Sequence, residues 1–249
     1  MHKILEIDNV SRQFGGLKAI SDLSLDIERK EILGLIGPNG AGKTTLFNLI
    51  CGFLRPTKGI IRFKGEMIHG LKPHKIVRRG ITKTFQIPKP FQSLTCFENI
   101  IVSMLPNFGS TNQETRLIEE EAQEIMNMVG LKGKKEMFPE TLTQGDLKQL
   151  EIARALATKP DLLLLDEPFA GLTQDEIENL SSLIQSLHRK EISIMIVEHK
   201  MRELMKIVQR VVVLDFGQKI ADGSPEQVVR QDKVIEAYLG SGGYSVNHA

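Results

Sequence analysis

The sequence GPNGAGKTT at residues 37–45 decides the fold class of this chain. It fits the pattern G-x-x-x-x-G-K-[ST], follows the apolar run at 32–36 and opens a predicted helix from Gly42 to Cys51. The glycines allow the backbone to close around phosphate groups, whose charge the loop amides and the helix N-terminus attract. A glycine-rich turn without a ligand is the alternative, and the flanking strand and helix favour a phosphate site. The predicted nucleotide-binding residues of this loop are Gly37, Pro38, Asn39, Gly40, Ala41, Gly42, Lys43, Thr44 and Thr45.

A second apolar run, LLLLDEP at 162–168, ends in two carboxylates. As a buried strand it would place Asp166 at the carboxyl edge of a sheet, where Asp166 and the Thr44 hydroxyl can hold Mg²⁺. Glu167 would face the γ-phosphate, where a base can polarise an attacking water. Two acidic residues after a strand commonly mark only its end, but the phosphate loop earlier in the chain favours a catalytic pair.

The alternation of strands and helices predicts an α/β fold. Apolar runs at 162–166, 192–197 and 211–216 are separated by helical periodicity, which is typical of a parallel sheet with helical crossovers. Residues 4–10 and the alternating residues 23–27 are typical of half-exposed antiparallel strands. We therefore predict a P-loop NTPase core with a mixed sheet and an antiparallel β part.

The middle of the chain has helical character. Thr95 and Glu98 have the spacing of a capping box, apolar residues predict a helix over 113–129, and 106–112 has the composition of a loop. Ser224, Pro225 and Gln227 likewise predict the start of a helix. The predicted organisation is a core formed by residues 1–86 and 158–240, a helical subdomain over 87–157 and a mobile tail over 241–249.

Composition excludes several classes of protein. The 249 residues carry a net charge of +1, and only 5% are aromatic, which argues against a nucleic-acid partner. Two cysteines cannot form a disulfide framework and fit a reducing compartment. The longest apolar runs are far shorter than a membrane-spanning helix, and the acidic residues near the start of the chain argue against a signal peptide. Any association with a membrane is expected to depend on a partner.

Over residues 4–240 the chain resembles the ATPase subunit of ATP-binding cassette (ABC) transporters. The resemblance rests on GPNGAGKTT and LLLLDEP together with five further motifs in the family's order. These are RQFGG at 12–16, TFQ at 84–86, LTQGDLKQLEIARAL at 142–156, AGLT at 170–173 and IVEH at 196–199. Three stretches are most similar to importers of branched-chain amino acids: FGG at 14–16, IVEH at 196–199 and DKVIEAYLG at 232–240.

The resemblance implies a role for each motif. Phe14 would stack on adenine, Gln86 would contact Mg²⁺ and the attacking water, and His199 would contact the γ-phosphate. Catalysis would then depend on Glu167, His199 and Gln86, with Mg²⁺ held by Thr44, Gln86 and Asp166. Taken alone, Phe14 suits a core position, Gln86 a surface loop and His199 a structural histidine. Glu198 and Lys200 are expected to be solvated.

The resemblance also implies cofactors and partners. ATP and Mg²⁺ would be bound, and a second ATPase subunit would contribute its signature to each ATP. Two membrane permeases, met by the segment after Gln86 that includes Phe91, and a solute-binding protein would complete an importer at the cytoplasmic face of the membrane. The alternatives are an exporter of lipid or lipopolysaccharide, a weakly hydrolysing regulatory cassette, and a soluble cassette in translation or DNA repair.

Two positions depart from the family pattern. The signature, commonly LSGGQ, is LTQGD here, so the expected contacts to ATP across the dimer come from Thr143, Gln144, Gly145 and Asp146. Asp146 is expected to bring a negative charge towards the phosphate, which would weaken closure of the dimer. Thr173 stands where the family commonly has aspartate in its dimer-contact loop.

Overall fold

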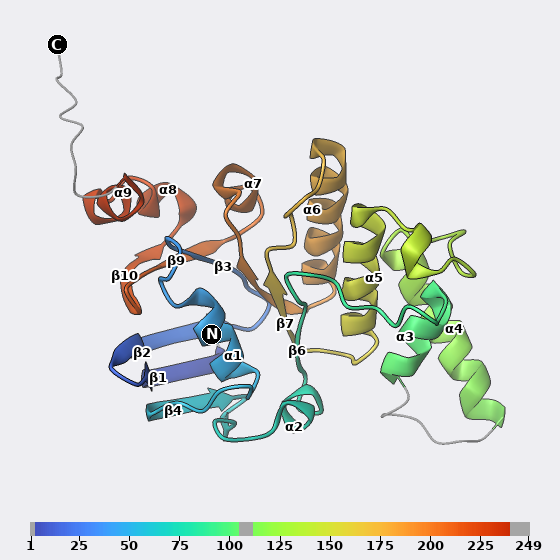
Figure 1. Ribbon diagram of the computed structural model, residues 1–249, viewed down its shortest axis with the longest axis horizontal. Helices are drawn as coiled ribbons and strands as arrows, with labels where there is room; N and C mark the ends of the chain where they lie inside the picture. The colour runs from blue at the N-terminus through green and yellow to red at the C-terminus, as the bar shows by residue number, and fades with distance from the viewer. Residues whose placement is uncertain (1–2, 105–111, 240–249) are drawn as a thin grey trace, which may run out of the picture.

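The computed structural model describes residues 3–104 and 112–239 and contains two sheets (Figure 1). The first is antiparallel with the order β2-β1-β4-β5. Its strands are β1 (Lys3–Phe14), β2 (Leu17–Glu28), β4 (Lys58–Phe63) and β5 (Glu66–Met67). The second has the order β10-β9-β3-β8-β7-β6. Its strands are β3 (Ile32–Ile36), β6 (Ile81–Lys83), β7 (Leu162–Asp166), β8 (Ser193–Val197), β9 (Arg210–Asp215) and β10 (Gln218–Gly223).

Helices cover the second sheet, and a further group of helices lies to one side of it (Figure 1). They are α1 (Lys43–Ile50), α2 (Pro73–Val77), α3 (Cys96–Met104), α4 (Asn112–Met128), α5 (Gln144–Leu156), α6 (Gln174–Arg189), α7 (Met201–Met205), α8 (Pro225–Val228) and α9 (Asp232–Leu239). A short 3₁₀ helix spans Pro139–Thr141. The predicted α/β class with an antiparallel β part is confirmed.

The parallel strands carry the predicted site to one edge of the sheet. β3 lies between β8 and β9, and β7 lies between β8 and β6, all in parallel register. Leu35 pairs with Val197, which in turn pairs with Asp166. Because the carboxyl ends of parallel strands share one edge, the segments that follow β3, β7 and β8 meet there.

Side chains on the two faces of β3 belong to different parts of the core. Ile32 and Ile36 join a cluster formed with α3 to α6, whereas Leu33 and Leu35 join a cluster formed with α1 and the antiparallel sheet. All five residues of β3 are buried, as predicted for a strand covered on both faces. The central strand is therefore held from both sides, which gives the phosphate loop a rigid support.

The predicted helix starts in the middle and last thirds are confirmed. The Thr95 amide donates to Glu98 at 2.8 Å while the Glu98 amide donates to the Thr95 hydroxyl at 3.2 Å. Ser224 and Gln227 form a complete capping box with Pro225 in the first turn. α4 agrees with the predicted helix, whereas residues 106–111 of the predicted loop and the predicted tail at 241–249 lie outside the described residues.

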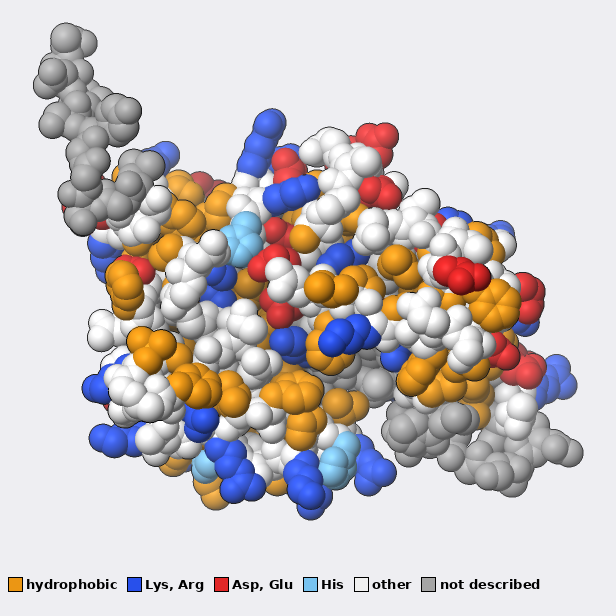
Figure 2. Space-filling view, viewed as in Figure 1, with side chains coloured by type: hydrophobic (Ala, Val, Ile, Leu, Met, Phe, Trp, Pro, Cys, Tyr) orange, Lys and Arg blue, Asp and Glu red, His pale blue; other side chains and the backbone are white. Residues whose placement is uncertain are grey.

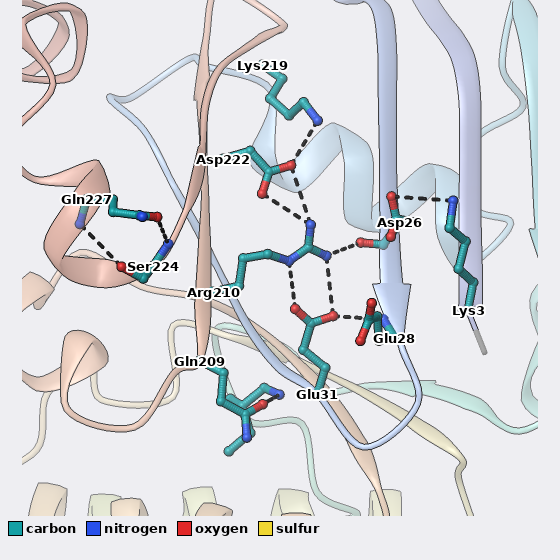
Figure 3. A network of polar contacts seen from close by, with 11 residues as sticks. Lys3, Asp26, Glu28, Glu31, Gln209, Arg210, Lys219, Asp222, Ser224 and Gln227 are labelled. Carbon is teal, nitrogen blue, oxygen red and sulfur yellow. Dashed lines mark hydrogen bonds and ion pairs between the residues drawn. The ribbon is translucent and has the colours of Figure 1, made fainter. Parts of the chain in front are cut away.

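A half-buried arginine on β9 joins the two sheets (Figure 3). Arg210 pairs with Glu31 at 2.7 Å and with Asp222 at 3.1 Å, and it donates to the Asp26 carbonyl. Glu31 also accepts the Glu28 amide at 2.7 Å. One planar guanidinium thus bridges three strands and the turn after β2, and fixes the antiparallel sheet against the edge of the core. Within the described residues, no helix is long and apolar enough to cross a membrane.

Candidate functional site

The loop from Gly37 to Thr45 requires glycine at two positions for steric reasons. Gly37 has φ 149°, and a Cβ there would lie 2.1 Å from the Leu214 carbonyl oxygen. Gly42 has φ 104°, and its Cβ would lie 2.6 Å from the Ala19 carbonyl oxygen. Any larger residue would push the loop away from β9 or β2. The motif therefore fixes the shape of the loop before any ligand arrives.

Lys43 lies at the centre of this loop. Its Nζ donates to the Gly37 carbonyl at 2.6 Å and to the Pro38 carbonyl at 3.0 Å, and the side chain is buried. Burial lowers the pKa of Lys43, an effect that the carboxylates of Glu167 and Asp166 oppose. The ammonium is thus held near two carboxylates at the mouth of the loop, where phosphate oxygens can replace the carbonyl contacts.

A cleft of about 410 Å³ opens over the loop and contains most of the predicted site residues. Its lining comes from Phe14 on β1, residues 17–19 on β2, the loop residues 39–45, the pair Glu167 and His199 after β7 and β8, and Phe216 after β9. Phe14 is 42% exposed, with the guanidinium of Arg12 at 4.5 Å from its ring centroid. An exposed aromatic ring at one end and a phosphate loop at the other suit a nucleotide.

Three side chains predicted to act together are in contact. Glu167 accepts a hydrogen bond from Gln86 Nε2 at 2.7 Å through one carboxylate oxygen, and its other oxygen lies 3.1 Å from His199 Nε2. Glu167 has φ 49°, a left-handed conformation that is unfavourable for glutamate and that the surrounding contacts must hold in place. Its amide donates to the Val197 carbonyl at 2.9 Å, which holds the turn against β8. The carboxylate is therefore aimed by both neighbouring loops.

Asp166 ends β7 and is buried beside the loop. Its carboxylate pairs with Lys83 on β6 at 3.1 Å, a partner that sequence reasoning missed. The remaining expected Mg²⁺ ligands are the Thr44 hydroxyl, which lines the cleft, and Gln86. Hydroxyl, amide and carboxylate oxygens are the ligands that Mg²⁺ prefers, so the residues present fit this ion.

Sequence reasoning also missed Lys148 on α5. Its Nζ donates to the carbonyl of Gln86 at 2.8 Å and to the carbonyl of Glu167 at 3.2 Å, and the residue is 4% exposed. Burial lowers the pKa of Lys148, and neighbouring carboxylates oppose that shift. One turn further on, Glu151 accepts the Phe85 amide at 2.7 Å, and burial raises the pKa of Glu151 to about 7. One face of α5 thus holds the backbone of both Gln86 and Glu167.

We expect Lys148→Met to lower ATP turnover at least tenfold, because it removes the ammonium that holds the carbonyls of Gln86 and Glu167, and hydrogen bonds to charged groups contribute about 1.5–3 kcal/mol each. Phosphate release and nucleotide titration would measure the change, and affinity should stay within about threefold because Lys148 lies behind the catalytic pair. Lys148→Arg should restore part of the rate. Gln149→Met, on the next residue of α5, is the matched control. Equal turnover in Lys148→Met and wild type would contradict this positioning role.

The expectation for Glu198 is wrong. This residue is 2% exposed rather than solvated, and its carboxylate accepts the amides of Phe169 at 2.6 Å, His199 at 2.8 Å and Lys200 at 3.0 Å. Three amide donors satisfy a buried carboxylate. Glu198 therefore ties the segment after Glu167 to the segment that carries His199.

The expectation for Asp146 is also wrong. Its carboxylate turns back on α5, where it accepts the Thr143 amide at 3.2 Å and pairs with Lys134 at 2.5 Å. Burial raises its pKa, but the contacts with Lys134 and Thr143 outweigh that effect and lower it overall. The charge is compensated locally, and the T-x-x-D spacing is the signal that predicts this cap. The exposed Thr143 and Gln144 remain at the helix start, and Gly145 lies against Glu176 of α6.

Comparison with known proteins places this geometry in a family. The profile of the ABC transporter family matches residues 20–170, and a profile described as branched-chain amino acid ATP-binding cassette transporter matches residues 218–244. The first contains the phosphate loop, Gln86, the signature and the carboxylate pair. The second contains β10, α8 and α9.

Individual relatives agree over nearly the whole chain. The high-affinity branched-chain amino acid transport ATP-binding protein BraF of Pseudomonas aeruginosa is 41% identical, covering 95% of this chain and 98% of its own. The lipopolysaccharide export system ATP-binding protein LptB of Haemophilus influenzae is 35% identical, with coverage of 95% and 97%. A crystal structure of the ADP conformation of MJ1267, an ATP-binding cassette of an ABC transporter, superposes with a TM-score of 0.87 at 29% identity, covering 96% of this chain and all of that one. This chain belongs to the ABC transporter family, as one of its ATP-hydrolysing cassettes.

Proposed function

We propose that this cassette hydrolyses ATP to drive the uptake of branched-chain amino acids through membrane permeases. The observation that carries the proposal is the match of residues 218–244 to the branched-chain amino acid cassette profile. BraF and the LivG protein of Escherichia coli, 36% identical over 95% of this chain, carry the same solute class in their names. The likeness to LptB supports a second candidate, the export of lipopolysaccharide. The profile matched by residues 218–244 describes branched-chain amino acid transporters and so favours the first candidate.

Hydrolysis follows from the groups that line the cleft. The adenine would lie on Phe14, and the phosphates would lie in the loop with Lys43 on their terminal oxygens. Glu167 would accept a proton from the attacking water while Gln86 holds the carboxylate in place, and His199 would donate to the γ-phosphate. Thr44, Gln86 and Asp166 would hold Mg²⁺, which when bound neutralises the charge that develops on the phosphates.

A second cassette would complete each site. The N-terminus of α5, with Thr143, Gln144 and Gly145, would face the γ-phosphate of the ATP on the partner, because helix N-termini attract anions. The internal pairing of Asp146 supports ordinary closure rather than the weakened closure expected from an unpaired charge. We therefore favour an active cassette over a weakly hydrolysing regulatory one.

A groove of about 300 Å³ supports docking of a permease at the cytoplasmic face of the membrane. It lies between α2 and α5 and is lined by apolar residues of α2, by Phe53 and Phe85, and by Arg154. Arg154 also lies 5.0 Å from the ring centroid of Phe91, which is 47% exposed. A permease segment in this groove would touch Phe85, the residue before Gln86, and so sense the catalytic site. The solute-binding protein would act on the far side of the membrane.

We expect Phe91→Glu to uncouple the transporter, because a charge at the rim of an apolar groove opposes burial of a partner. Nucleotide binding by the isolated cassette should be unchanged, while stimulation of its ATPase by the permeases should fall at least tenfold. Phe138→Glu is the matched control, since Phe138 is 43% exposed like Phe91, whereas Phe91 lies against Arg154 of the groove. Loss of nucleotide binding in isolated Phe91→Glu would mean that Phe91 supports the fold instead.

The proposed solute can be tested in proteoliposomes that contain the cassette, its permeases and the solute-binding protein. Leucine, isoleucine or valine should stimulate ATP hydrolysis. They should accumulate inside vesicles that enclose ATP and carry the cassette on their inner face, with the solute-binding protein added outside. Lipopolysaccharide should have no effect. Stimulation by lipopolysaccharide and not by amino acids would favour the export candidate.

A further inference from the structure

Positive charge is concentrated in one segment of the chain. Residues 55–83 contain nine lysines and arginines but one acidic residue, Glu66, whereas the other 220 residues contain 23 basic and 30 acidic residues. The net charge of +1 therefore conceals a strongly basic segment within an acidic protein. Such asymmetry indicates an electrostatic partner for that part of the surface.

Five basic residues of this segment form an exposed surface, here called the basic face. They are Arg55, Lys58, Lys72, Lys75 and Arg78. Within the described residues, no acidic side chain forms an ion pair with any of the five. In Figure 2, Lys and Arg side chains gather along the lower edge of the molecule, over α2 and β4. Three other basic residues of the segment do form ion pairs with carboxylates: Lys64, Arg79 and Lys83.

The basic face continues directly into the groove proposed for the permease. Pro73, Ile76 and Val77 of α2 line that groove, while Lys75 of α2 and its N-cap Lys72 are exposed. The apolar side chain of Phe53, at the rim of the groove, is 52% exposed. Apolar and basic side chains are mixed in this way on surfaces that lie against lipid headgroups.

We propose that the basic face docks on the anionic phospholipid headgroups of the membrane that holds the permeases. The orientation of this face rests on the proposed function, because a permease seated in the groove would bring the neighbouring α2 towards the bilayer. Lysine and arginine form charge-assisted hydrogen bonds with phosphate, and each one near an anionic surface strengthens binding about fivefold. The attraction falls off within about 10 Å and weakens with salt, so the face orients the cassette without anchoring it.

Nucleic acid is the competing partner for a basic surface, and two features favour lipid. The exposed apolar side chains beside the basic face, Phe53 and the 61%-exposed Met67 of β5, suit an interface with headgroups and acyl chains. The chain also belongs to a family of membrane transporters. A membrane partner explains both the charge and the position of the face next to the groove.

The test uses the purified full chain and sedimentation with vesicles of phosphatidylcholine, either alone or mixed with phosphatidylglycerol. The wild type should bind the mixed vesicles at least about tenfold more tightly, and salt should weaken that binding. The triple variant Lys72→Glu, Lys75→Glu, Arg78→Glu should lose at least tenfold in affinity for the mixed vesicles. A control with the same change in net charge, Lys132→Glu, Arg189→Glu, Lys233→Glu, should keep it. Both variants should bind ATP as the wild type does, which shows that each is folded.

Several outcomes would overturn the proposal. Equal binding of the wild type to both kinds of vesicle would exclude a role for anionic lipid. An equal loss of vesicle affinity in the control variant would mean that net charge, and not the basic face, determines binding. Tighter binding to a short DNA duplex than to mixed vesicles at physiological salt would assign the face to nucleic acid. Normal vesicle binding by the triple variant, with lost stimulation by detergent-solubilised permeases, would assign it to a permease loop. Since the vesicle assay contains neither permease nor amino acid, its result does not depend on the transported solute.

Discussion

Replacing Glu167 by glutamine is expected to abolish most ATP hydrolysis while ATP binding remains. The amide keeps the size of the side chain but cannot accept a proton from water, and general bases typically contribute about 10²–10⁴-fold to a rate. Glu167 already contacts both Gln86 and His199, so it is the group to which the two loops converge. Phosphate release under single-turnover conditions would measure the loss, and equilibrium titration with a fluorescent ATP analogue would measure binding.

The same variant should accumulate as an ATP-bound dimer if, as we propose, ATP closes two cassettes and its hydrolysis reopens them. Light scattering with and without ATP would detect the dimer. Glu178→Gln on the exposed surface of α6 is a control for loss of one negative charge and should behave as the wild type. Turnover near the wild-type rate in Glu167→Gln would exclude Glu167 as the base and leave His199 as the remaining candidate at this site.

Replacing Lys43 by alanine is expected to weaken ATP binding by roughly 10- to 150-fold, since hydrogen bonds to charged groups contribute about 1.5–3 kcal/mol. The ammonium is buried at the centre of the loop and held by the Gly37 and Pro38 carbonyls, so it is placed to meet phosphate without a large rearrangement. Isothermal titration of ATP would give the affinity. Thermal unfolding without nucleotide would show whether loss of these two contacts disturbs the fold.

Lys18 provides a matched control for Lys43, because it lines the same cleft from β2 but lies outside the phosphate loop. Lys18→Ala should change the affinity far less than Lys43→Ala. Equal ATP affinity in Lys43→Ala and the wild type would contradict the assignment of residues 37–45 as the phosphate site.

The parts of the fold that sequence analysis predicted depend on local signals. The phosphate loop, the buried strands on either side of it and the capping boxes at Thr95 and Ser224 have residue patterns within a few positions. The strands β4 and β6 were missed because their pairing is set by distant partners, whereas β10 pairs with the adjacent β9 and was missed because only one of its six residues is buried. Ile61 pairs with Ile7 and Ile81 pairs with Leu162, across spans of chain that contain other elements. The three residues of β6 are also too few to show a period.

The candidate site divides in the same way. Gln86, Glu167 and His199 could be named because each belongs to a recognisable motif, and the structure brings the three side chains together. Lys148 could not, because its charged end lies next to residues of two other segments that only the folded chain brings to α5. Glu198 was misplaced because a polar residue after a strand usually faces solvent. Here its carboxylate is covered by the loop that contains Phe169.

The rate of phosphate release by the purified chain, measured against protein concentration with and without Mg²⁺, shows whether the phosphate loop and Glu167 form a hydrolytic centre. We predict Mg²⁺-dependent hydrolysis whose rate per cassette rises with concentration, because two cassettes would have to meet around each ATP. Glu167→Gln should release only background phosphate at every concentration. Equal release by the wild type and Glu167→Gln across the whole range would contradict a hydrolytic centre built on the phosphate loop and Glu167.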